Sequence, residues 1–252
     1  MINATPQESC PAPALSVVVP AYNEAENLRP VIEETLKKLK DSPDLPSFEI
    51  IIVDDGSTDE TAFVAEYLER QHPEVMIRKH RNNQGYGSAL NTGYSVSSGS
   101  FVTTLPADGE IPPSEALRLY ALRRQADVIT SSRSAEDPTI EQTVRPLSRR
   151  FLSAGLRYLS IFVLGVDPVG KEGPLLLRGD LARGTELWSR TGLVQIELIL
   201  KCRKKGCSFG SGQIFFRRRL SGSSKVANLR TIILYLLEML KVKAMLLLNK
   251  PF

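Results

Sequence analysis

Short apolar runs of strand length alternate with amphipathic segments of helix length over the first half of the chain. Runs rich in β-branched residues predict strands at residues 15–20, 48–53, 75–79, 101–105 and 127–131. Helical spacing of apolar residues predicts helices between them, at residues 24–39, 59–71, 85–97 and 114–125. This alternation predicts an α/β fold: a mostly parallel, Rossmann-like sheet with right-handed crossovers, flanked by helices.

The pattern changes after Arg133. Residues 136–146 are predicted to form a loop and residues 209–219 a strand, followed by a Gly/Ser loop at 221–224. Amphipathic helices are predicted at 147–164, 192–205 and 229–248. The last contains four charged residues, so it does not resemble a membrane-spanning helix. Two placements fit it: flat in a membrane interface, or packed on the domain.

Charge is distributed very unevenly along the chain. Residues 1–200 contain 20 Lys and Arg against 27 Asp and Glu, a net charge of −7. Residues 201–252 contain 12 Lys and Arg against the single acid Glu238, a net charge of +11. Such a basic segment attracts phosphates, whether on a ligand, a nucleic acid or an anionic membrane. The simpler alternative is a solvated basic face.

The N-terminal residues and the cysteine content bear on the compartment. Residues 1–14 are polar and lack the basic stretch and apolar core of a signal peptide, so we expect a flexible leader and a cytoplasmic location. The 3 cysteines are scattered, which argues against a disulfide framework. With only 2 histidines and no Cys-x-x-Cys pair, a structural zinc site is not expected either.

Polar clusters follow four of the predicted strands, at Tyr22-Asn23-Glu24, Asp54-Asp55, Asp108-Gly109-Glu110 and Ser131-Ser132-Arg133. Parallel sheets bind ligands at the carboxyl ends of their strands, so these clusters predict one site. The Asp55 carboxylate can accept hydrogen bonds from a base or a ribose. Asp108 and Glu110 offer hard oxygen ligands for Mg²⁺ or Mn²⁺, which bridge phosphates. Alternatively, Asp108-Gly109 is only a turn with an exposed carboxylate.

The segments VVVPAYNEAENL, FEIIIVDDGSTDET, NQGYGSALNTGY and TLPADGEIPP together resemble family 2 glycosyltransferases of the GT-A fold. Downstream, SSR at 131–133, GVDP at 165–168, IELILKCRKKG and RLSGSSK are similar to the polyprenyl-phosphate glycosyltransferases, the group of dolichyl-phosphate mannose synthase. The resemblance covers residues 15–225. It implies a GT-A domain there, with residues 226–252 as a C-terminal amphipathic helix.

The resemblance also implies roles for individual residues, which a structure can place. The nucleotide pocket would be lined by Pro20, Tyr22, Glu24, Val53, Asp55 and Ala107. Asp108 would coordinate the metal, together with Glu110. Arg133 and Arg219 would bind phosphates and, with Asp108, form the catalytic set. Arg219, Ser224 and Lys225 would bind the acceptor phosphate; which of Arg217, Arg218 and Arg219 points inward stays open.

Two segments depart from the family pattern. Pro106 stands where the family usually has the first Asp of Asp-x-Asp, so one oxygen ligand is lost. Weaker metal binding, altered donor choice and an inactive enzyme are the three consequences we consider. The segment VGKEGPLLLR at 169–178 replaces a usually short Ser-Gly-Phe segment, which leaves the placement of the acceptor open.

The predicted activity is inverting, metal-dependent transfer of a hexose from a UDP- or GDP-linked sugar to a polyprenyl phosphate. A phosphate acceptor is already anionic and needs little base catalysis, whereas a hydroxyl acceptor needs a positioned base. Residues 185–200 contain no Glu–Asp pair, and Glu197 lies in an apolar stretch typical of a structural role. A sugar hydroxyl acceptor and a catalytically impaired nucleotide-sugar-binding scaffold remain the alternatives.

The remaining partners follow from the charge pattern. Location at the cytosolic membrane face, as a peripheral protein, agrees with the basic C-terminal segment and a lipid acceptor. Nucleic acid is not an expected partner, because no nucleic-acid-binding motif accompanies the aromatic and basic residues of 209–219. Assembly into a homo-oligomer stays open.

Overall fold

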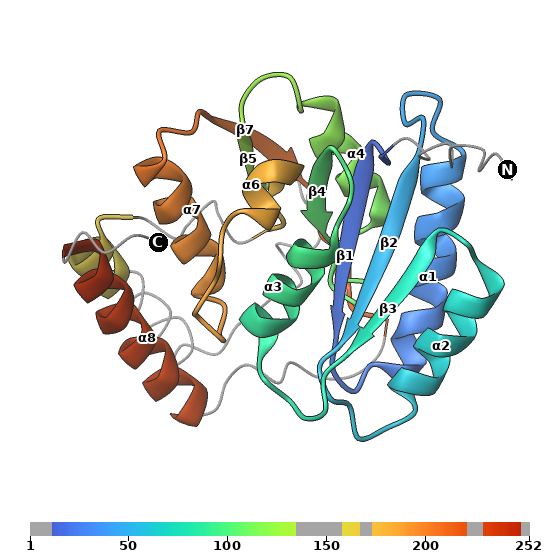
Figure 1. The fold of residues 1–252 in the computed structure, drawn as a ribbon, viewed down its shortest axis with the longest axis horizontal. Coiled ribbons are helices and arrows are strands. Elements are labelled where there is room, and N and C mark those ends of the chain that lie inside the picture. Colours follow the sequence, from blue (N-terminus) through green and yellow to red (C-terminus); the bar gives the residue numbers. More distant parts are fainter. Residues whose placement is uncertain (1–11, 135–157, 167–172, 221–228, 248–252) are drawn as a thin grey trace, which may run out of the picture.

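The computed structural model describes residues 12–134, 158–166, 173–220 and 229–247. Its described strands form one seven-stranded sheet in the order β3-β2-β1-β4-β6-β5-β7 (Figure 1). The strands are β1 (Leu15–Ala21), β2 (Phe48–Asp54), β3 (Val75–Lys79), β4 (Phe101–Thr104), β5 (Val128–Arg133), β6 (Leu176–Arg178) and β7 (Phe209–Ile214). All neighbours are parallel except β6, which is antiparallel to both β4 and β5. The predicted α/β class and mostly parallel sheet are confirmed.

Helices cover both faces of the sheet, as the alternating pattern requires. They are α1 (Ala25–Lys40), α2 (Thr61–Gln71), α3 (Tyr86–Val96), α4 (Pro113–Ala121), α6 (Gly179–Arg183), α7 (Val194–Lys204) and α8 (Leu229–Leu247). Residues 158–164 are helical too. One core cluster joins α1, α2 and α4 to the sheet, and a second joins α3, α6 and α7 to it.

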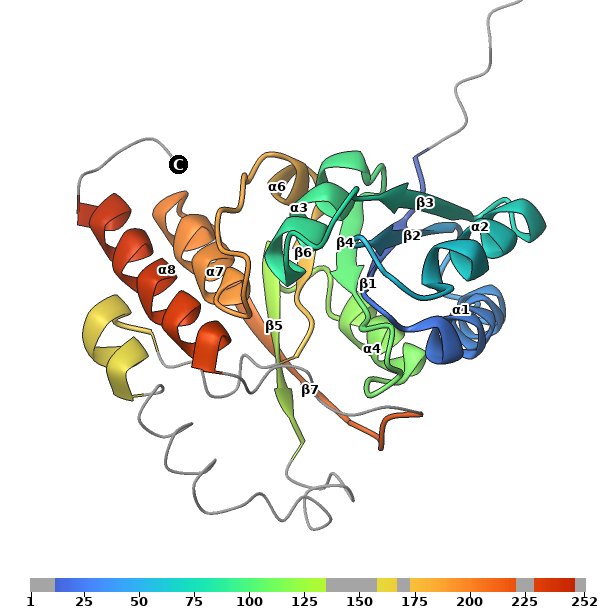
Figure 2. The same ribbon diagram turned by 90° about the horizontal axis from the view of Figure 1, so that it is seen from below.

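A third apolar cluster lies apart from the two clusters on the sheet and involves α8. Leu193, Ile196 and Leu200 on α7 and its flank pack against Met239 and Val242 of α8, together with Leu164. Figure 2 accordingly shows α8 as an outer layer beside α7, with the helical residues 158–164 next to it. None of the helices described by the structure is long and apolar enough to cross a membrane.

Four features differ from the sequence-based predictions. The strand expected at 209–219 ends at Ile214, and the helix expected at 114–125 ends at Ala121, where Leu122 and Arg123 turn back onto the preceding carbonyls. Strand β6 and the short helix α6 were not predicted at all. Most of the predicted helix at 147–164, the loop at 136–146 and residues 1–11 of the leader lie outside the described residues.

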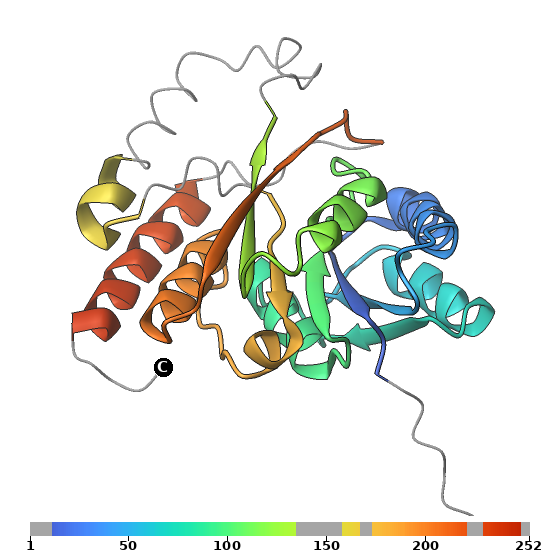
Figure 3. The same ribbon diagram turned by 90° about the horizontal axis from the view of Figure 1, so that it is seen from above.

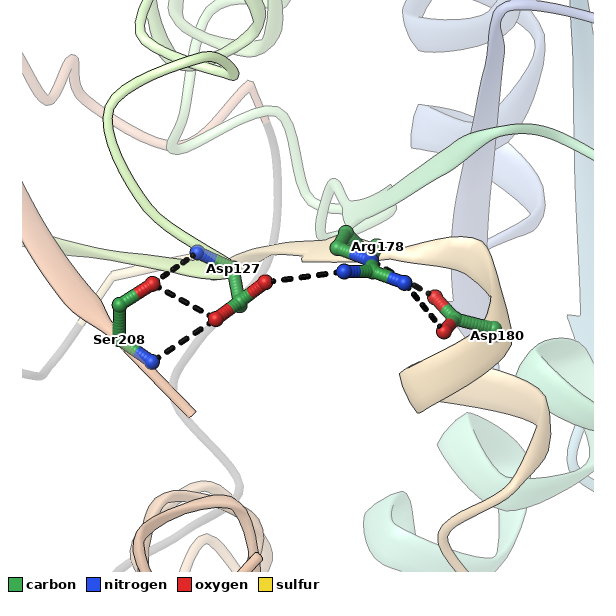
Figure 4. A network of polar contacts seen from close by, with 4 residues as sticks. All are labelled: Asp127, Arg178, Asp180 and Ser208. Carbon is green, nitrogen blue, oxygen red and sulfur yellow. Dashed lines mark hydrogen bonds and ion pairs between the residues drawn. The ribbon is translucent and has the colours of Figure 1, made fainter. Parts of the chain in front are cut away.

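A polar network fastens β6 and its neighbours at the amino ends of β5 and β7 (Figure 4). Arg178 bonds to Asp127 (3.1 Å) and to Asp180 (2.7 Å), while Asp127 accepts hydrogen bonds from the amide (2.9 Å) and hydroxyl (2.6 Å) of Ser208. The hydrogen bonds from Ser208, and then the Arg178 guanidinium, hold the pKa of Asp127 below its usual value. The network lies at the opposite ends of the strands from the polar clusters that predict the site.

Candidate functional site

The predicted site residues gather at the carboxyl edge of the sheet. Pro20 pairs with Val53 in the β1–β2 ladder, and the amide of Asp55 donates to the carbonyl of Ala21 (2.9 Å). Beyond β4, the amide of Leu105 donates to the carbonyl of Val18 (3.0 Å), which leads the chain toward Asp108 beside the end of β1. Strand β5 runs in the same direction as β4, because both are antiparallel to β6. Arg133, the last residue of β5, therefore lies at the same edge of the sheet. Figure 3 shows β5 in green beside β7 in orange, in agreement with their pairing.

The loop after β1 is fixed to the loop after β2. Asn23 has a positive φ of 54°, a conformation that asparagine tolerates better than most residues. Its amide donates to the hydroxyl of Ser57 (2.9 Å), and its side-chain oxygen accepts from the amide of Thr58 (2.8 Å). The amide of Glu24 donates to the hydroxyl of Thr61 (2.8 Å). Hydrogen bonds to the loop after β2 thus fix the loop that carries Tyr22 and Glu24.

Asp55 is buried and its carboxylate is engaged inside the protein. One oxygen accepts from the amide of Gln84 (2.9 Å) and lies 2.7 Å from Nδ1 of His80; the other accepts from the amide of Gly85 (2.8 Å). A carboxylate here stabilises the amino end of α3. The predicted contact of Asp55 with a base or ribose stays a prediction. His80 was not singled out from the sequence, although it follows β3 as the other clusters follow their strands.

Asp108, Gly109 and Glu110 form a tight turn after β4. Gly109 has a φ of +70°, and the amide of Glu110 donates to Oδ1 of Asp108 (3.0 Å). Asp108 is 9 % exposed, so the alternative of an exposed turn carboxylate is wrong. Nη2 of Arg219 lies 3.0 Å from Oδ2 of Asp108 and 3.5 Å from Oε2 of Glu110. Of Arg217, Arg218 and Arg219, it is therefore Arg219 whose guanidinium faces the two carboxylates of the turn.

Residues 217–220, which we call the strap, hold this turn from the other side. The amide of Arg217 donates to the carbonyl of Glu110 (2.8 Å), and the amide of Leu220 donates to the carbonyl of Asp108 (3.3 Å). The Arg217 guanidinium bonds to the carbonyl of Gly109 (2.6 Å) and forms an ion pair with Glu34 (2.7 Å). Beyond the last pair of β5 and β7, Arg133 with Ile214, these bonds attach the chain to the turn after β4.

Arg133 lies at the end of β5, with its guanidinium carbon 4.3 Å from the ring centroid of Phe216. This cation–π contact orients Arg133 next to the segment that leads into the strap. The predicted acceptor-phosphate residues Ser224 and Lys225 lie outside the described residues.

The donor set at Asp108 and Glu110 fits a hydrated divalent ion. Two carboxylates approach one nitrogen within 3.5 Å, so their oxygens can share a single cation. Mg²⁺ and Mn²⁺ in such sites take one or two carboxylates, with waters and substrate phosphates completing the shell. The described residues include no group of three or more His, Cys, Asp and Glu side chains able to hold a metal. The pair therefore suits an ion shared with a ligand, not an all-protein cage.

Two further elements of the site were missed by sequence reasoning. Tyr86 begins α3, and burial, with smaller contributions from Tyr94 and Asp108, raises the pKa of its phenol well above the usual value. The phenol is hydrogen-bonded to Gln195 and is close enough to Asp108 to respond to its charge. A tyrosine directly after the Asn-Gln-Gly turn was the available signal, since α3 starts at the same edge of the sheet.

The second element is the loop 186–191, held by carboxylates from two helices. Glu197 of α7 accepts from the amides of Trp188 (3.0 Å) and Ser189 (2.8 Å). Glu238 of α8 accepts from the amide of Arg190 (2.7 Å). The carbonyl of Arg190 in turn accepts from the amide of Gly87 in α3 (3.1 Å). The loop thus connects α3, α7 and α8, and residues of the loop and of α8 line an open pocket of about 470 Å³.

Curated relatives are similar over most of the chain. A dolichyl-phosphate beta-glucosyltransferase of Trichomonas vaginalis is 30 % identical over 184 residues, covering 66 % of this chain and 53 % of the relative. The dolichol-phosphate mannosyltransferase of Pyrococcus furiosus is 29 % identical over 193 residues, covering 74 % of this chain and 52 % of the relative. The chain thus spans about half the length of these relatives.

Solved structures share the fold. Glucosyl-3-phosphoglycerate synthase from Mycobacterium tuberculosis, in complex with Mn²⁺, UDP-glucose and phosphoglyceric acid, superposes with a TM-score of 0.65 at 19 % identity, over 90 % of this chain and 79 % of that one. At this identity the likeness shows the fold alone, which is the GT-A fold. The family model for Glycosyl transferase family 2 matches residues 16–168. The chain is therefore a member of glycosyltransferase family 2.

Proposed function

We propose that this protein transfers a hexose from a nucleotide diphosphate sugar to a polyprenyl phosphate, with inversion at the anomeric carbon. The observation that carries the proposal is the convergence of Asp108, Glu110 and Arg219 at the carboxyl edge of the sheet. This arrangement supplies both an oxygen ligand set for a divalent ion and a cation for a diphosphate. The names of the two curated relatives support a lipid phosphate as acceptor.

The donor nucleotide would lie along the ends of β1 and β2. The buried residues Val53 and Ala107 would form an apolar wall. Pro20 lies near the end of β1, and Tyr22 and Glu24 belong to the loop that follows it. The Asp55 carboxylate, kept in place by His80 and two amides, would take the remaining polar contact with base or ribose. A pocket whose residues are already fixed by hydrogen bonds loses little conformational entropy when the nucleotide binds.

The chemistry follows from the charges of the reacting groups. A bound Mg²⁺ or Mn²⁺ supplies charge neutralisation for the diphosphate leaving group. Arg219 and Arg133 provide further positive charge where negative charge develops as the anomeric C–O bond to the diphosphate breaks. An oxygen of the acceptor phosphate forms the new bond from the opposite face, so the configuration inverts. That oxygen is already anionic, so the reaction needs no general base to remove a proton. Glu197, which is ion-paired with Lys201, is therefore not required as a base.

Calorimetric titration with UDP and GDP, each with and without Mn²⁺, tests the donor site first. We expect one of the two nucleotides to bind, and to bind more tightly with Mn²⁺. Radiolabelled sugar from the matching donor should then pass into the organic phase with polyprenyl phosphate. Label that stays in water with a sugar acceptor would favour the hydroxyl alternative. Absence of binding by either nucleotide would contradict the proposal and favour a scaffold disabled by Pro106.

We also propose that α8 rests on a membrane surface. Its outward face carries Ile233, Leu237 and Leu240, each at least half exposed, and the neighbouring helical residue Phe162 is 88 % exposed. Contiguous exposed apolar residues on a surface mark an interaction site. Lys241 and Lys243 on the same helix would reach anionic headgroups while the leucines enter the interface.

The double change Leu237→Asp and Leu240→Asp should weaken binding to vesicles containing anionic lipid by about tenfold or more, given the usual gain from burying a leucine. Co-sedimentation with vesicles measures this. Phe63→Asp is the matched control, because Phe63 is 65 % exposed on the distant helix α2. Equal losses in both variants, or unchanged binding in the α8 variant, would contradict the proposed membrane contact.

A further inference from the structure

Arg219 occupies the point at which the two carboxylates converge. Its Nη2 atom lies 3.0 Å from Asp108 and 3.5 Å from Glu110, so one guanidinium compensates both negative charges. Asp108 Oδ1 is already used by the amide of Glu110, and Oδ2 faces Arg219. A divalent ion bound by both carboxylates would have to occupy the position between them where the Arg219 guanidinium now lies.

The surrounding contacts allow the Arg219 side chain to move while its main chain stays in place. The amides of Arg217 and Leu220, on either side of it, are bonded to the turn at Glu110 and Asp108. The Arg217 side chain is fixed separately, by Glu34 and the carbonyl of Gly109. Rotation about the side-chain bonds of Arg219 is therefore sufficient to withdraw the guanidinium while the strap stays in place.

We propose that Arg219 and the divalent ion exchange places at the Asp108–Glu110 pair. Before the donor binds, Arg219 neutralises the carboxylates; when the ion takes this position, the guanidinium turns to the diphosphate. The inference rests on the proposed function, because the diphosphate is what receives the displaced arginine. Two cations cannot share the pair without strong repulsion at this distance. The phosphates offer Arg219 an equally good charged partner.

A consequence is that metal and nucleotide strengthen one another's binding. The ion alone must displace Arg219 into solvent, whereas with nucleotide present the displaced side chain gains a new partner. By linkage, the nucleotide must then raise metal affinity by the same factor by which the metal raises nucleotide affinity. Part of this coupling should disappear when residue 219 carries no charge.

The test is titration of Mn²⁺ without nucleotide, read by the electron paramagnetic resonance signal of the free ion. We expect Arg219→Gln to bind Mn²⁺ about tenfold more tightly than the unaltered protein, a factor typical of coupled sites. The same variant should bind UDP or GDP more weakly in the presence of Mn²⁺. Opposite changes in the affinities for metal and for nucleotide are the result expected of an exchange.

Arg218→Gln is the matched control: it removes the same charge from an exposed neighbour, and we expect its Mn²⁺ affinity to change by less than about twofold.

The proposal is overturned if Arg219→Gln leaves Mn²⁺ affinity unchanged or lowers it, or if Arg218→Gln raises it equally, which would indicate a long-range charge effect only. Thermal unfolding without metal checks that the variant is folded, and Arg219→Lys, which keeps a charge but loses the planar fork, should give an intermediate affinity. The Mn²⁺ titration needs neither sugar nor lipid. Tighter Mn²⁺ binding by Arg219→Gln, together with no glycolipid product from the unaltered protein, would therefore refute the proposed function while supporting the exchange.

Discussion

Replacing Asp108 by Asn is expected to reduce glycosyl transfer by roughly 10²-fold or more, the loss usual when one strong electrostatic contribution to a transition state is removed. The substitution deletes a negative charge from the pair that faces Arg219. The amide oxygen of Asn can still accept the hydrogen bond from the Glu110 amide, so the turn should keep its shape. Initial rates of sugar transfer to polyprenyl phosphate measure the effect.

The matched control for Asp108→Asn is Asp44→Asn. Asp44 is an exposed aspartate in the loop after α1, and it should tolerate the same loss of charge with activity unchanged. Equal thermal unfolding midpoints would confirm that both variants are folded. Full activity of Asp108→Asn would exclude the carboxylate from the metal site and with it the metal assignment of the turn.

Replacing Glu197 by Ala should lower the free energy of unfolding by about 3–5 kcal/mol, the usual cost of leaving one partner of a buried ion pair uncompensated. Glu197 and Lys201 are 2.7 Å apart, and their side chains are 1 % and 0 % exposed. The change also removes the acceptor of the Trp188 and Ser189 amides. Urea unfolding, followed by circular dichroism, measures the difference.

Two comparisons separate this effect from ordinary loss of charge. Arg29 and Glu33 form an ion pair at the same i,i+4 spacing on α1, but both side chains are about half exposed, so Glu33→Ala should change stability far less. Replacing Glu197 and Lys201 together by Leu and Met should recover part of the loss, because no unpaired charge remains. Equal effects of Glu197→Ala and Glu33→Ala would contradict the prediction.

Elements with strong local patterns were predictable from the sequence. The apolar runs that become β1, β2 and β4 are mostly buried, so their composition alone indicates strands, and the structure places their ends within one residue of the predicted ends. Strand β6 has only three residues and pairs with Phe101, more than 70 positions earlier in the chain. No local pattern contains that information.

The residues of the candidate site also divide into those that the sequence predicts and those that depend on tertiary contacts. Residues at strand ends, such as Asp55 and Asp108, could be assigned to one edge because parallel strands end together. The choice of Arg219 over its two neighbours depends on main-chain bonds between the strap and Glu110, which are more than 100 residues apart in sequence. The support of the loop 186–191 by Glu197 and Glu238 likewise depends on packing between helices.

The central position of β6 imposes an order on how the sheet is assembled during synthesis. Strands β3, β2, β1 and β4 can pair once residue 104 has left the ribosome, but the outer edge of β4 then remains open. Strand β5 has no neighbour until residues 176–178 arrive to bridge it to β4, and β7 is added later still. The half that contains β1 to β4 is thus expected to fold early, with an unprotected edge strand, while the half that carries Arg133 and Arg219 folds later. A nascent chain of this protein would depend on chaperones most in the interval between residues 104 and 178.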